Sequence, residues 1–531
     1  MIKTLVFALL SLSLRLAAFP NDVLTWHNDI ARTGQDLAER TLTLQNVNPK
    51  TFGKLFVIRV DGKVDAEPLY VHQLEMPNRG LWNVLFVATE HDSLYAFDAD
   101  TGQQFWRVQL LKPGETPSDN RNCGQITPEI GITSTPVIDL RQGPHGTIYT
   151  VAMSKGAQGR YTQRLYALDL RTGAEELGGP VEIHATFAGG NPFDPKQYAE
   201  RAALLSLNGV IYTTWTSHCD INPYNGWIIG YDARTLKQTS ALNITPNGEE
   251  GAIWQSGAGP AADPQGNIYL MAANGTFDTV LNSSGFPSKG DFGNSFLKLS
   301  THGGKFSIAD YFTMFNVAEE NAGDGDLGSG GPMVLPDMTD ASGRIQRLAV
   351  GAGKDLNIYL VNRDAMGKFN PHGNQNVYQE LRKAMKHSFS RPIPAYFSGR
   401  LYYASTDDTL REYRLQNARL VAEPVSQTAL KFGYPGTTPS ISANGSRNAI
   451  IWAVENVKFS YAAGYSNPAV LHAYDATDLS RELYNSNQAP SGRDHFGAGN
   501  KFITPMIANG KVYVGTTNGV GVFGLLPKRV Q

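Results

Sequence analysis

Charged and aromatic residues recur at one type of position in this 531-residue chain, a few residues before a segment that in most cases contains proline. We expect these side chains to gather at one opening of the fold: the carboxylates Glu67, Glu129 and Asp326, the arginines Arg201, Arg391 and Arg493, and the neighbours Trp254 and Gln255. Convergent carboxylates could bind Ca²⁺, which takes several oxygen ligands, and one of them could remove a substrate proton. Arginines could hold a carboxylate-bearing ligand through paired hydrogen bonds.

We therefore predict catalytic roles for Asp326 and Glu129, and cofactor-binding roles for the other six residues. The sequence leaves a structural explanation open for each of them. Glu129 in "TPEIGITSTP" could bond the backbone of its own loop, and Asp324 with Asp326 in "AGDGDLGSGGP" could belong to simple turns. Trp254 could pack in a seam between repeats, and His387, at another such position, could be structural and not a base.

An internal repeat supplies the elements that must position these residues. The segment "LYAFDADTGQQFW" (94–106) returns almost unchanged as "LYALDLRTGAEEL" (165–177). A preceding pattern, glycine followed after one residue by an aliphatic residue and tyrosine, recurs at Gly146, Gly209, Gly266, Gly399 and Gly510, and looser copies bring the total to eight. Apolar and polar residues alternate in several copies, which predicts strands with one buried face. Eight such units predict an all-β, eight-bladed β-propeller.

The two ends of the chain are expected to close the ring. The last unit stops after a third strand, whereas a spare strand, "GKLFVIRVDG" (53–62), lies near the N-terminus. We predict that this N-terminal strand completes the last blade, so that no sheet edge stays unpaired. The expected domains are a signal peptide over residues 1–18, a lead-in segment over 19–52, and a single propeller over 53–527.

The run from Ala96 to Trp106 resembles the tryptophan-docking motif of the pyrroloquinoline quinone (PQQ) dehydrogenases, and residues 26–55 resemble the lead-in of that family. The resemblance implies a quinoprotein-type propeller that binds PQQ and Ca²⁺ in its axial funnel and oxidises an alcohol or a sugar. The chain departs from the family in lacking adjacent cysteines. It also has no Cys-x-x-Cys-His, so no covalently attached haem is expected.

Two other classes of function stay open beside the oxidoreductase. One is a cofactor-free propeller enzyme, an isomerase, cyclase or lyase acting on a small metabolite. The other is a non-catalytic module that binds a glycan or a protein. We expect no NAD, because no dinucleotide-binding glycine motif follows a strand, and no nucleic acid, because the net charge is only −2. No histidine and cysteine cluster has zinc-site spacing, so no metal ligands are assigned.

The N-terminus predicts secretion by a signal peptide, since Lys3 precedes the apolar run 5–14 and cleavage near Ala18 is plausible. The mature protein is expected to be monomeric and to have no membrane segment. Two cysteines, Cys123 and Cys219, allow one disulfide in an oxidising compartment. Glycan acceptors are predicted at the four Asn-x-Ser/Thr sites, Asn243, Asn274, Asn282 and Asn444.

Overall fold

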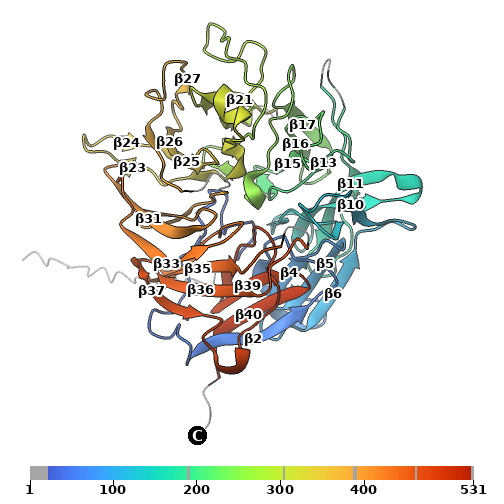
Figure 1. Ribbon diagram of the computed structural model, residues 1–531. Coiled ribbons are helices and arrows are strands. Elements are labelled where there is room, and N and C mark those ends of the chain that lie inside the picture. The colour runs from blue at the N-terminus through green and yellow to red at the C-terminus, as the bar shows by residue number, and fades with distance from the viewer. Residues whose placement is uncertain are drawn as a thin grey trace, which may run out of the picture.

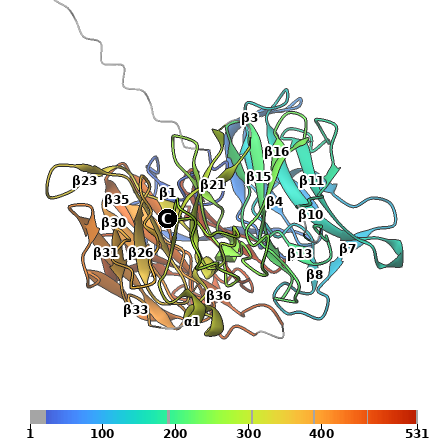
Figure 2. The same cartoon turned by 90° about the horizontal axis from the view of Figure 1, so that it is seen from above.

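Eight β-sheets stand in a ring around a central channel in the computed structural model (Figures 1 and 2). The structure describes residues 22–187, 190, 192–302, 305–386, 391–460 and 463–527. The predicted signal peptide and His387 therefore lie outside the described residues. The eight-bladed propeller predicted from the repeat is confirmed.

Each blade is an antiparallel sheet whose strands run in order from the channel outward. Blades 1 to 4 consist of β3 (Leu69–Met76), β4 (Gly80–Ala88), β5 (Ser93–Asp98) and β6 (Gln104–Gln109); β9 (Val137–Asp139), β10 (Thr147–Lys155), β11 (Tyr161–Asp169) and β12 (Val181–Glu182); β14 (Leu205–Leu207), β15 (Val210–Ser217), β16 (Trp227–Asp232) and β17 (Gln238–Asn243); and β18 (Ala261–Ala262), β19 (Ile268–Met271), β20 (Phe296–Ser300) and β21 (Ser307–Thr313).

Blades 5 to 8 follow the same plan. They consist of β22 (Met333–Val334), β25 (Leu348–Ala352), β26 (Ile358–Asn362) and β28 (Gln379–Leu381); β29 (Ala395–Phe397), β30 (Arg400–Tyr403), β31 (Asp408–Gln416) and β33 (Ser426–Phe432); β34 (Ser440–Asn444), β35 (Arg447–Asn456), β36 (Ala469–Asp475) and β37 (Asp478–Asn485); and β38 (Met506–Ala508), β39 (Lys511–Thr516), β40 (Gly519–Leu525) and β2 (Phe52–Arg59).

Shorter elements decorate this ring. They are β1 (Gln35–Asp36), β7 (Thr116–Asp119), β8 (Glu129–Ile130), β13 (Tyr198–Ala199), β23 (Met338–Thr339), β24 (Ile345–Gln346), β27 (Lys368–Phe369), β32 (Arg419–Leu420) and the helix α1 (Val317–Ala322). Among the residues that the structure describes, no helix is long and apolar enough to cross a membrane.

The repeated segment at residues 94–106 and 165–177 has a physical role in joining neighbouring blades. The indole of Trp106, at the outer strand of blade 1, donates to the carbonyl of Leu170 in blade 2 over 3.1 Å. A Cβ atom added to Gly173 would lie 2.8 Å from the Trp106 ring, so only glycine leaves room for the indole. Asp169 fixes the intervening turn by accepting hydrogen bonds from the backbone and side chain of Thr172.

Closure of the ring by the N-terminal strand is confirmed, because β2 pairs with β40 as the outermost strand of blade 8. The pair Arg493–Asp494 fastens this strand. Asp494 accepts the backbone N–H of Lys54 over 3.1 Å, while Arg493 reaches the carbonyl of Phe52 and binds Asp494. Arg493 is thus a clamp on the closing strand, and it lines neither of the cavities described below.

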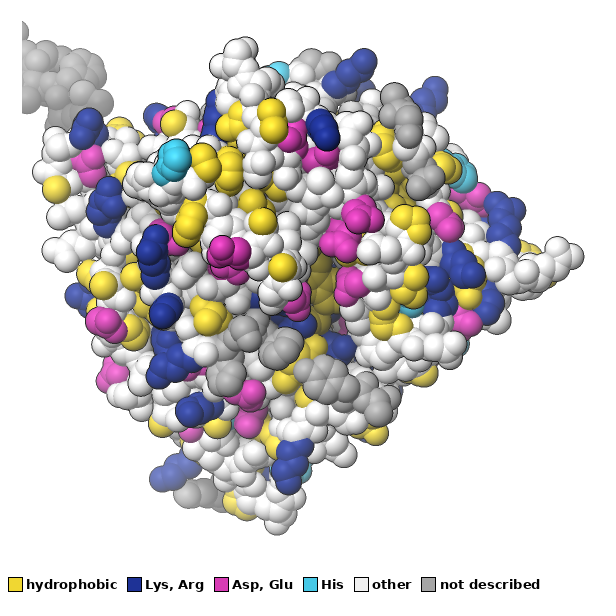
Figure 3. Space-filling view, turned by 45° about the horizontal axis from the view of Figure 1, so that its top comes forward, with side chains coloured by type: hydrophobic (Ala, Val, Ile, Leu, Met, Phe, Trp, Pro, Cys, Tyr) yellow, Lys and Arg dark blue, Asp and Glu magenta, His cyan; other side chains and the backbone are white. Residues whose placement is uncertain are grey.

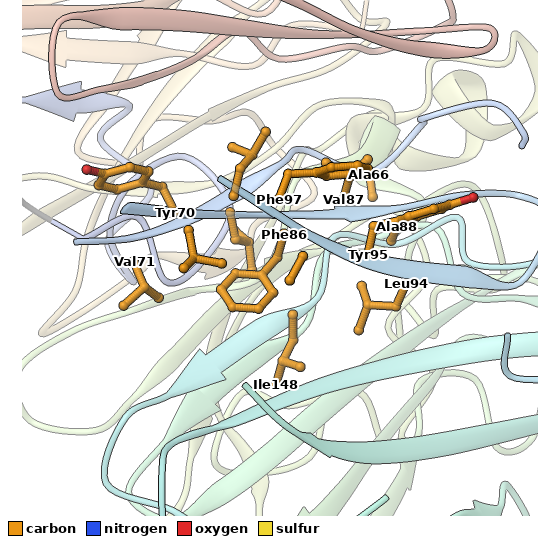
Figure 4. Close-up of a cluster of buried hydrophobic side chains, with 14 of the residues drawn as sticks. Ala66, Tyr70, Val71, Phe86, Val87, Ala88, Leu94, Tyr95, Phe97 and Ile148 are labelled. Atoms are coloured by element: carbon orange, nitrogen blue, oxygen red, sulfur yellow. The ribbon is translucent and has the colours of Figure 1, made fainter. Parts of the chain in front are cut away.

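Apolar side chains fill each blade and the seams between blades. Figure 4 shows one such cluster, where Phe86 of blade 1 lies close to Ile148 of blade 2. Burial of these large side chains gives the dominant favourable term in folding, at about 1.5–3 kcal/mol for each fully buried residue. The result is a stiff frame from which loops project.

The lead-in segment crosses the channel and bonds to most inner strands in turn. Backbone carbonyls of residues 23–34 accept hydrogen bonds from the inner strands of blades 1, 2, 4, 5, 6 and 7, from the N–H groups of Tyr70, Ile138, Ala262, Val334, Tyr396 and Ile441. This pairing satisfies strand edges that would otherwise face an open channel.

Candidate functional site

Two adjoining cavities open where loops precede the inner strands. The first, here called the acidic cavity, has a volume of about 350 Å³. It is lined by Gln125, Thr216, Asp220, Tyr224, Glu250, Ala252, Trp254, Ala273, Asn274, Asn321, Asp324, Asp326, Lys354 and Arg391. The second, here called the cysteine cavity, measures about 720 Å³ and shares Gln125 and Arg391 with the first. Figure 3 shows a face of the molecule with a hollow bordered by acidic side chains.

A carboxylate and an ammonium group meet in the acidic cavity. Asp326 is only 8% exposed, and its Oδ2 atom lies 3.4 Å from Nζ of Lys354. Lys354 also donates to Asp324 over 2.8 Å, and the backbone N–H of Asn274 donates to Asp326 over 3.2 Å. Burial raises the pKa of Asp326, and the nearby Lys354 charge opposes that rise. Asp326 is therefore a more basic carboxylate than an exposed aspartate.

A network of side-chain amides holds the Asp326 loop in place. Asn294 accepts the backbone N–H of Leu327 over 2.8 Å and donates to the side-chain oxygens of Asn274 and Asn321. Gly328 makes a close approach possible, because a Cβ atom there would meet the backbone nitrogen of Ala273 at 2.4 Å. The loop before the inner strand of blade 5 is thereby held against the loop that follows the second strand of blade 4.

The wall between the two cavities is aromatic and cationic. Trp254 meets Phe502 edge-on, with ring centroids 5.8 Å apart. The guanidinium of Arg391 lies over Tyr434 and Phe502, and that of Arg201 lies 5.4 Å from the Phe502 centroid. Such stacking holds the guanidinium groups in place against the aromatic rings.

Further cations lie behind this wall. Lys501 donates to the carbonyls of Gly124 and Gln125 over 3.2 and 3.1 Å, and its pKa is lowered to about 8, first by burial and then by the Lys63 and Arg391 charges. Asp65 lies 3.5 Å from Lys63 and supplies a compensating charge. The cysteine cavity therefore has a positive inner end, whereas the mouth of the acidic cavity carries carboxylates.

Three predicted residues, Asp326, Trp254 and Arg391, do line the acidic cavity. Arg201 lies just behind them, 4% exposed, and donates over 3.4 Å to the carbonyls of Thr133 and Lys501. These placements support the expectation that loops before the inner strands converge.

The other predictions of binding or catalysis do not fit where the residues lie. Gln255 is fully buried, and its side-chain amide bonds the backbone of Ala258 and Met271. Glu67 accepts the backbone N–H of His27 in the lead-in segment over 3.0 Å. Glu129 is bound to Nδ1 of His91 over 3.0 Å and lines neither cavity. These side chains, like Arg493, serve packing or loop structure.

Lys354, Asn321, Glu250 and Lys501 were missed by the sequence analysis. A usable signal existed for Lys354, which follows the second strand of blade 5. Antiparallel neighbours reverse direction, so the end of a second strand lies on the same face as the start of an inner strand. Asn274, just beyond β19, occupies the same place in blade 4. The catalytic and cofactor-binding residues predicted from the sequence all stand before an inner strand, whereas Lys354 and Asn274 stand after a second strand.

Cys123 and Cys219 form a disulfide across 96 residues of sequence, and Cys123 lines the cysteine cavity. The four candidate glycan acceptors differ in exposure. Asn282 and Asn444 are exposed, whereas Asn274 lines the acidic cavity and donates to Asp324. Asn243 is 5% exposed, which leaves no room for a glycan in the folded chain.

Comparison with known proteins supports the fold and goes no further. No family model matches the chain, and no curated protein sequence matches it either. Quinohemoprotein alcohol dehydrogenase from Comamonas testosteroni has a similar structure at a TM-score of 0.61 and 14% identity, covering 96% of this chain and 82% of that one. The quinohemoprotein alcohol dehydrogenase ADHIIG of Pseudomonas putida HK5 gives 0.58 and 14%, covering 95% and 80%. This chain is an eight-bladed β-propeller, similar in fold to the quinohemoprotein alcohol dehydrogenases.

Proposed function

We propose that this protein is an oxidoreductase that holds a quinone cofactor of the PQQ type and a calcium ion in the joined cavities, and oxidises an alcohol or a sugar. The observation that carries the proposal is the meeting of Trp254, Arg391, Lys354 and Asp326 around one cavity. The fold similarity to quinohemoprotein alcohol dehydrogenases supports it.

The donors and charges suit a planar anion such as PQQ. Its carboxylates match the cationic groups of Arg391 and Lys501, which both line the cysteine cavity, and those of Lys354 and Arg201 close by. Trp254 and Phe502 offer aromatic surface to a fused-ring system. When bound, the quinone would accept the two electrons of the alcohol, and calcium would polarise its carbonyl.

The oxygen donors suit calcium. Asp324 and Asp326 come from one loop and Asn274 from the next blade, and all three line the same cavity. Carboxylate and amide oxygens are hard ligands of the kind that Ca²⁺ takes. In the structure Lys354 binds both carboxylates, so its ammonium already stabilises negative charge where the ion would sit.

The role of Asp326 is that of a general base. Its burial raises the pKa, which strengthens the carboxylate as a proton acceptor, and the charge of Lys354 opposes that rise. Lys354 keeps the carboxylate oriented and stabilises its charge. Tyr224 and Glu250 line the same cavity and would position the hydroxyl groups of the substrate.

A titration with PQQ and Ca²⁺ tests this function, with thermal unfolding and the quinone absorption band as readouts. We expect saturable stabilisation that requires both ligands and is weaker in Arg391→Ala. Turnover of alcohols and sugars with a dye acceptor should then appear in the loaded protein. If ligand concentrations well above micromolar shift neither readout, the oxidoreductase function is wrong.

A cofactor-free enzyme is the second candidate, because the Asp326–Lys354 pair places a base and an acid 3.4 Å apart without any cofactor. Such a pair could abstract and return a proton in an isomerase or lyase. Conversion of a metabolite by protein free of PQQ, abolished by Asp326→Asn, would favour this function.

We further propose that the protein is secreted through an N-terminal signal peptide as a monomer, with glycans at the exposed Asn282 and Asn444. The disulfide between Cys123 and Cys219 supports an oxidising compartment. The proposed domain limits are a signal peptide over residues 1–18, a lead-in over 19–52 and a propeller over 53–527. Mass spectrometry of the mature chain would give its N-terminus and its glycosylated residues.

A further inference from the structure

A histidine, His218, lies directly against the disulfide between Cys123 and Cys219. The chain runs His218-Cys219 at the end of β15, and Cys123 reaches it from the long loop between β7 and β8. Nε2 or Nδ1 of His218 and the two sulfurs lie within 4.8 Å of one another. In the part of the chain that the structure describes, this is the one group of three His, Cys, Asp or Glu residues close enough to share a metal ion.

His218 is held with one ring nitrogen unused. The side chain is 4% exposed, yet Nε2 has no hydrogen-bond partner. A buried polar atom without a partner costs about 1–3 kcal/mol, so native proteins rarely keep one without a use. The backbone fixes the residue, because its N–H donates to the carbonyl of Gln197 over 2.7 Å. A disulfide cannot satisfy this nitrogen well, whereas a metal ion could.

We propose that Cys123, His218 and Cys219 form a redox-gated binding site for a thiolate-preferring metal ion, of which Zn²⁺ is the simplest case. The site is closed to metal while the disulfide stands. A dithiol reductant supplies two electrons and two protons, the S–S bond breaks to give two thiols, and the reductant becomes a disulfide. Zn²⁺ then displaces the two thiol protons and binds two sulfurs and one imidazole nitrogen.

The ligand composition and the surroundings both suit this chemistry. Two cysteines and one histidine, with water as the fourth ligand, are a known zinc set with an open position. Cys123 lines the cysteine cavity, so the ion could be reached from solvent and by small ligands. Binding would also keep the loop at residues 120–127 attached to blade 3 after the disulfide is lost. This inference does not depend on the proposed oxidoreductase function.

The test is a cobalt titration of the full-length protein, reduced with a phosphine and exchanged free of it. We expect one Co²⁺ per chain, with thiolate-to-cobalt absorption in the near ultraviolet and the visible bands of tetrahedral Co²⁺, displaced by Zn²⁺. The oxidised protein should show neither. Zn²⁺ should raise the unfolding temperature of the reduced protein and leave that of the oxidised protein unchanged.

Variants separate this site from non-specific thiol binding. His218→Ala should weaken Co²⁺ binding by more than the roughly 10- to 100-fold that changes around a metal ligand cost. Cys219→Ser removes one of the two thiolate ligands, so the thiolate-to-cobalt absorption of the native site should be lost. His184→Ala is the matched control, because that side chain is 72% exposed and is not one of the three proposed ligands. Its Co²⁺ binding should not change.

Three results would overturn the proposal. One is a reduced, folded protein that binds no Co²⁺. Another is unchanged binding in His218→Ala, which would show that the thiols act without the imidazole. The third is loss of the fold on reduction, shown by circular dichroism, because the site requires both loops in place.

Discussion

Two levels of the central channel are filled in opposite ways. At the level of the inner strands, the lead-in segment fills the channel with buried groups whose hydrogen bonds are satisfied. Arg32, 1% exposed, donates to the carbonyls of Pro260 and Trp26 and to the hydroxyl of Thr25. At the level of the preceding loops, Asp326 faces a cavity. Its carboxylate contacts Nζ of Lys354 at 3.4 Å and the backbone N–H of Asn274 at 3.2 Å.

The same short segments serve both levels. In blade 4 the cavity is lined by Trp254, and four residues later Ala258 packs against Trp26 of the lead-in. In blade 6 Arg391 lines the cavity, and Ile393 packs against the same indole. From this contrast we propose that the level of the inner strands stabilises the ring, whereas the level of the preceding loops binds ligands. Substitutions at the two levels should therefore separate stability from activity.

The largest effect is expected from Asp326→Asn. Loss of the general base should lower turnover by about 10²- to 10⁴-fold. The unfolding temperature should fall little, because burial makes the charged carboxylate costly in the folded state. Steady-state rates and thermal unfolding measure the two quantities. A large fall in stability with unchanged turnover would place Asp326 in the structural level instead.

Arg32→Ala should do the opposite. Removing a fully buried guanidinium with several hydrogen bonds should lower the free energy of unfolding by about 3 kcal/mol or more. Cofactor affinity of the remaining folded protein should be unchanged. Denaturant unfolding measures the loss, and the exposed Arg40→Ala provides the control. A loss below about 1 kcal/mol would show that the lead-in segment does not stabilise the ring.

Arg391→Ala and Arg493→Ala form a matched pair, since a cofactor-binding role is predicted for both arginines from the sequence. Arg391→Ala should weaken PQQ binding about tenfold, through loss of a charge-assisted contact in the cavity. Arg493→Ala should leave binding unchanged and lower stability, because it releases the closing strand. Calorimetric titration beside thermal unfolding measures both. Equal effects on binding would contradict this distinction.

The smallest effect is a shift in pH dependence. Activity requires ionised Asp326, so kcat/KM should rise with pH through the pKa of that carboxyl, which lies above its ordinary value. Lys354→Met removes the positive charge that lowers this pKa, so the rising limb should move to higher pH. A pH profile of the variant beside the native protein measures the shift. No shift, or one toward lower pH, would show that another group titrates.

Local pattern determined much of the fold. Alternating apolar residues, the glycine before five of the eight second strands, and the turn at Asp169 act over a few residues, so the repeat could be recognised and counted. The closing strand was predictable for a similar reason, since a ring lacking one strand leaves an unpaired edge. Trp106 and Gly173 both lie in copies of this repeat, and they meet at the seam between blades 1 and 2.

Tertiary structure alone decided the site. The sequence placed Trp254, Gln255 and Arg391 at equivalent positions, but whether a side chain faces the cavity depends on the rotation of one backbone segment. Gln255 turns inward to bond Met271, while Trp254 faces the opening. Lys354 is 28 residues from Asp326 in sequence and reaches it only because two strands of one blade return to the same face. His218 follows β15 of blade 3 and meets Cys123 from the loop between β7 and β8 beside blade 2, a contact between neighbouring blades that is not encoded in local spacing.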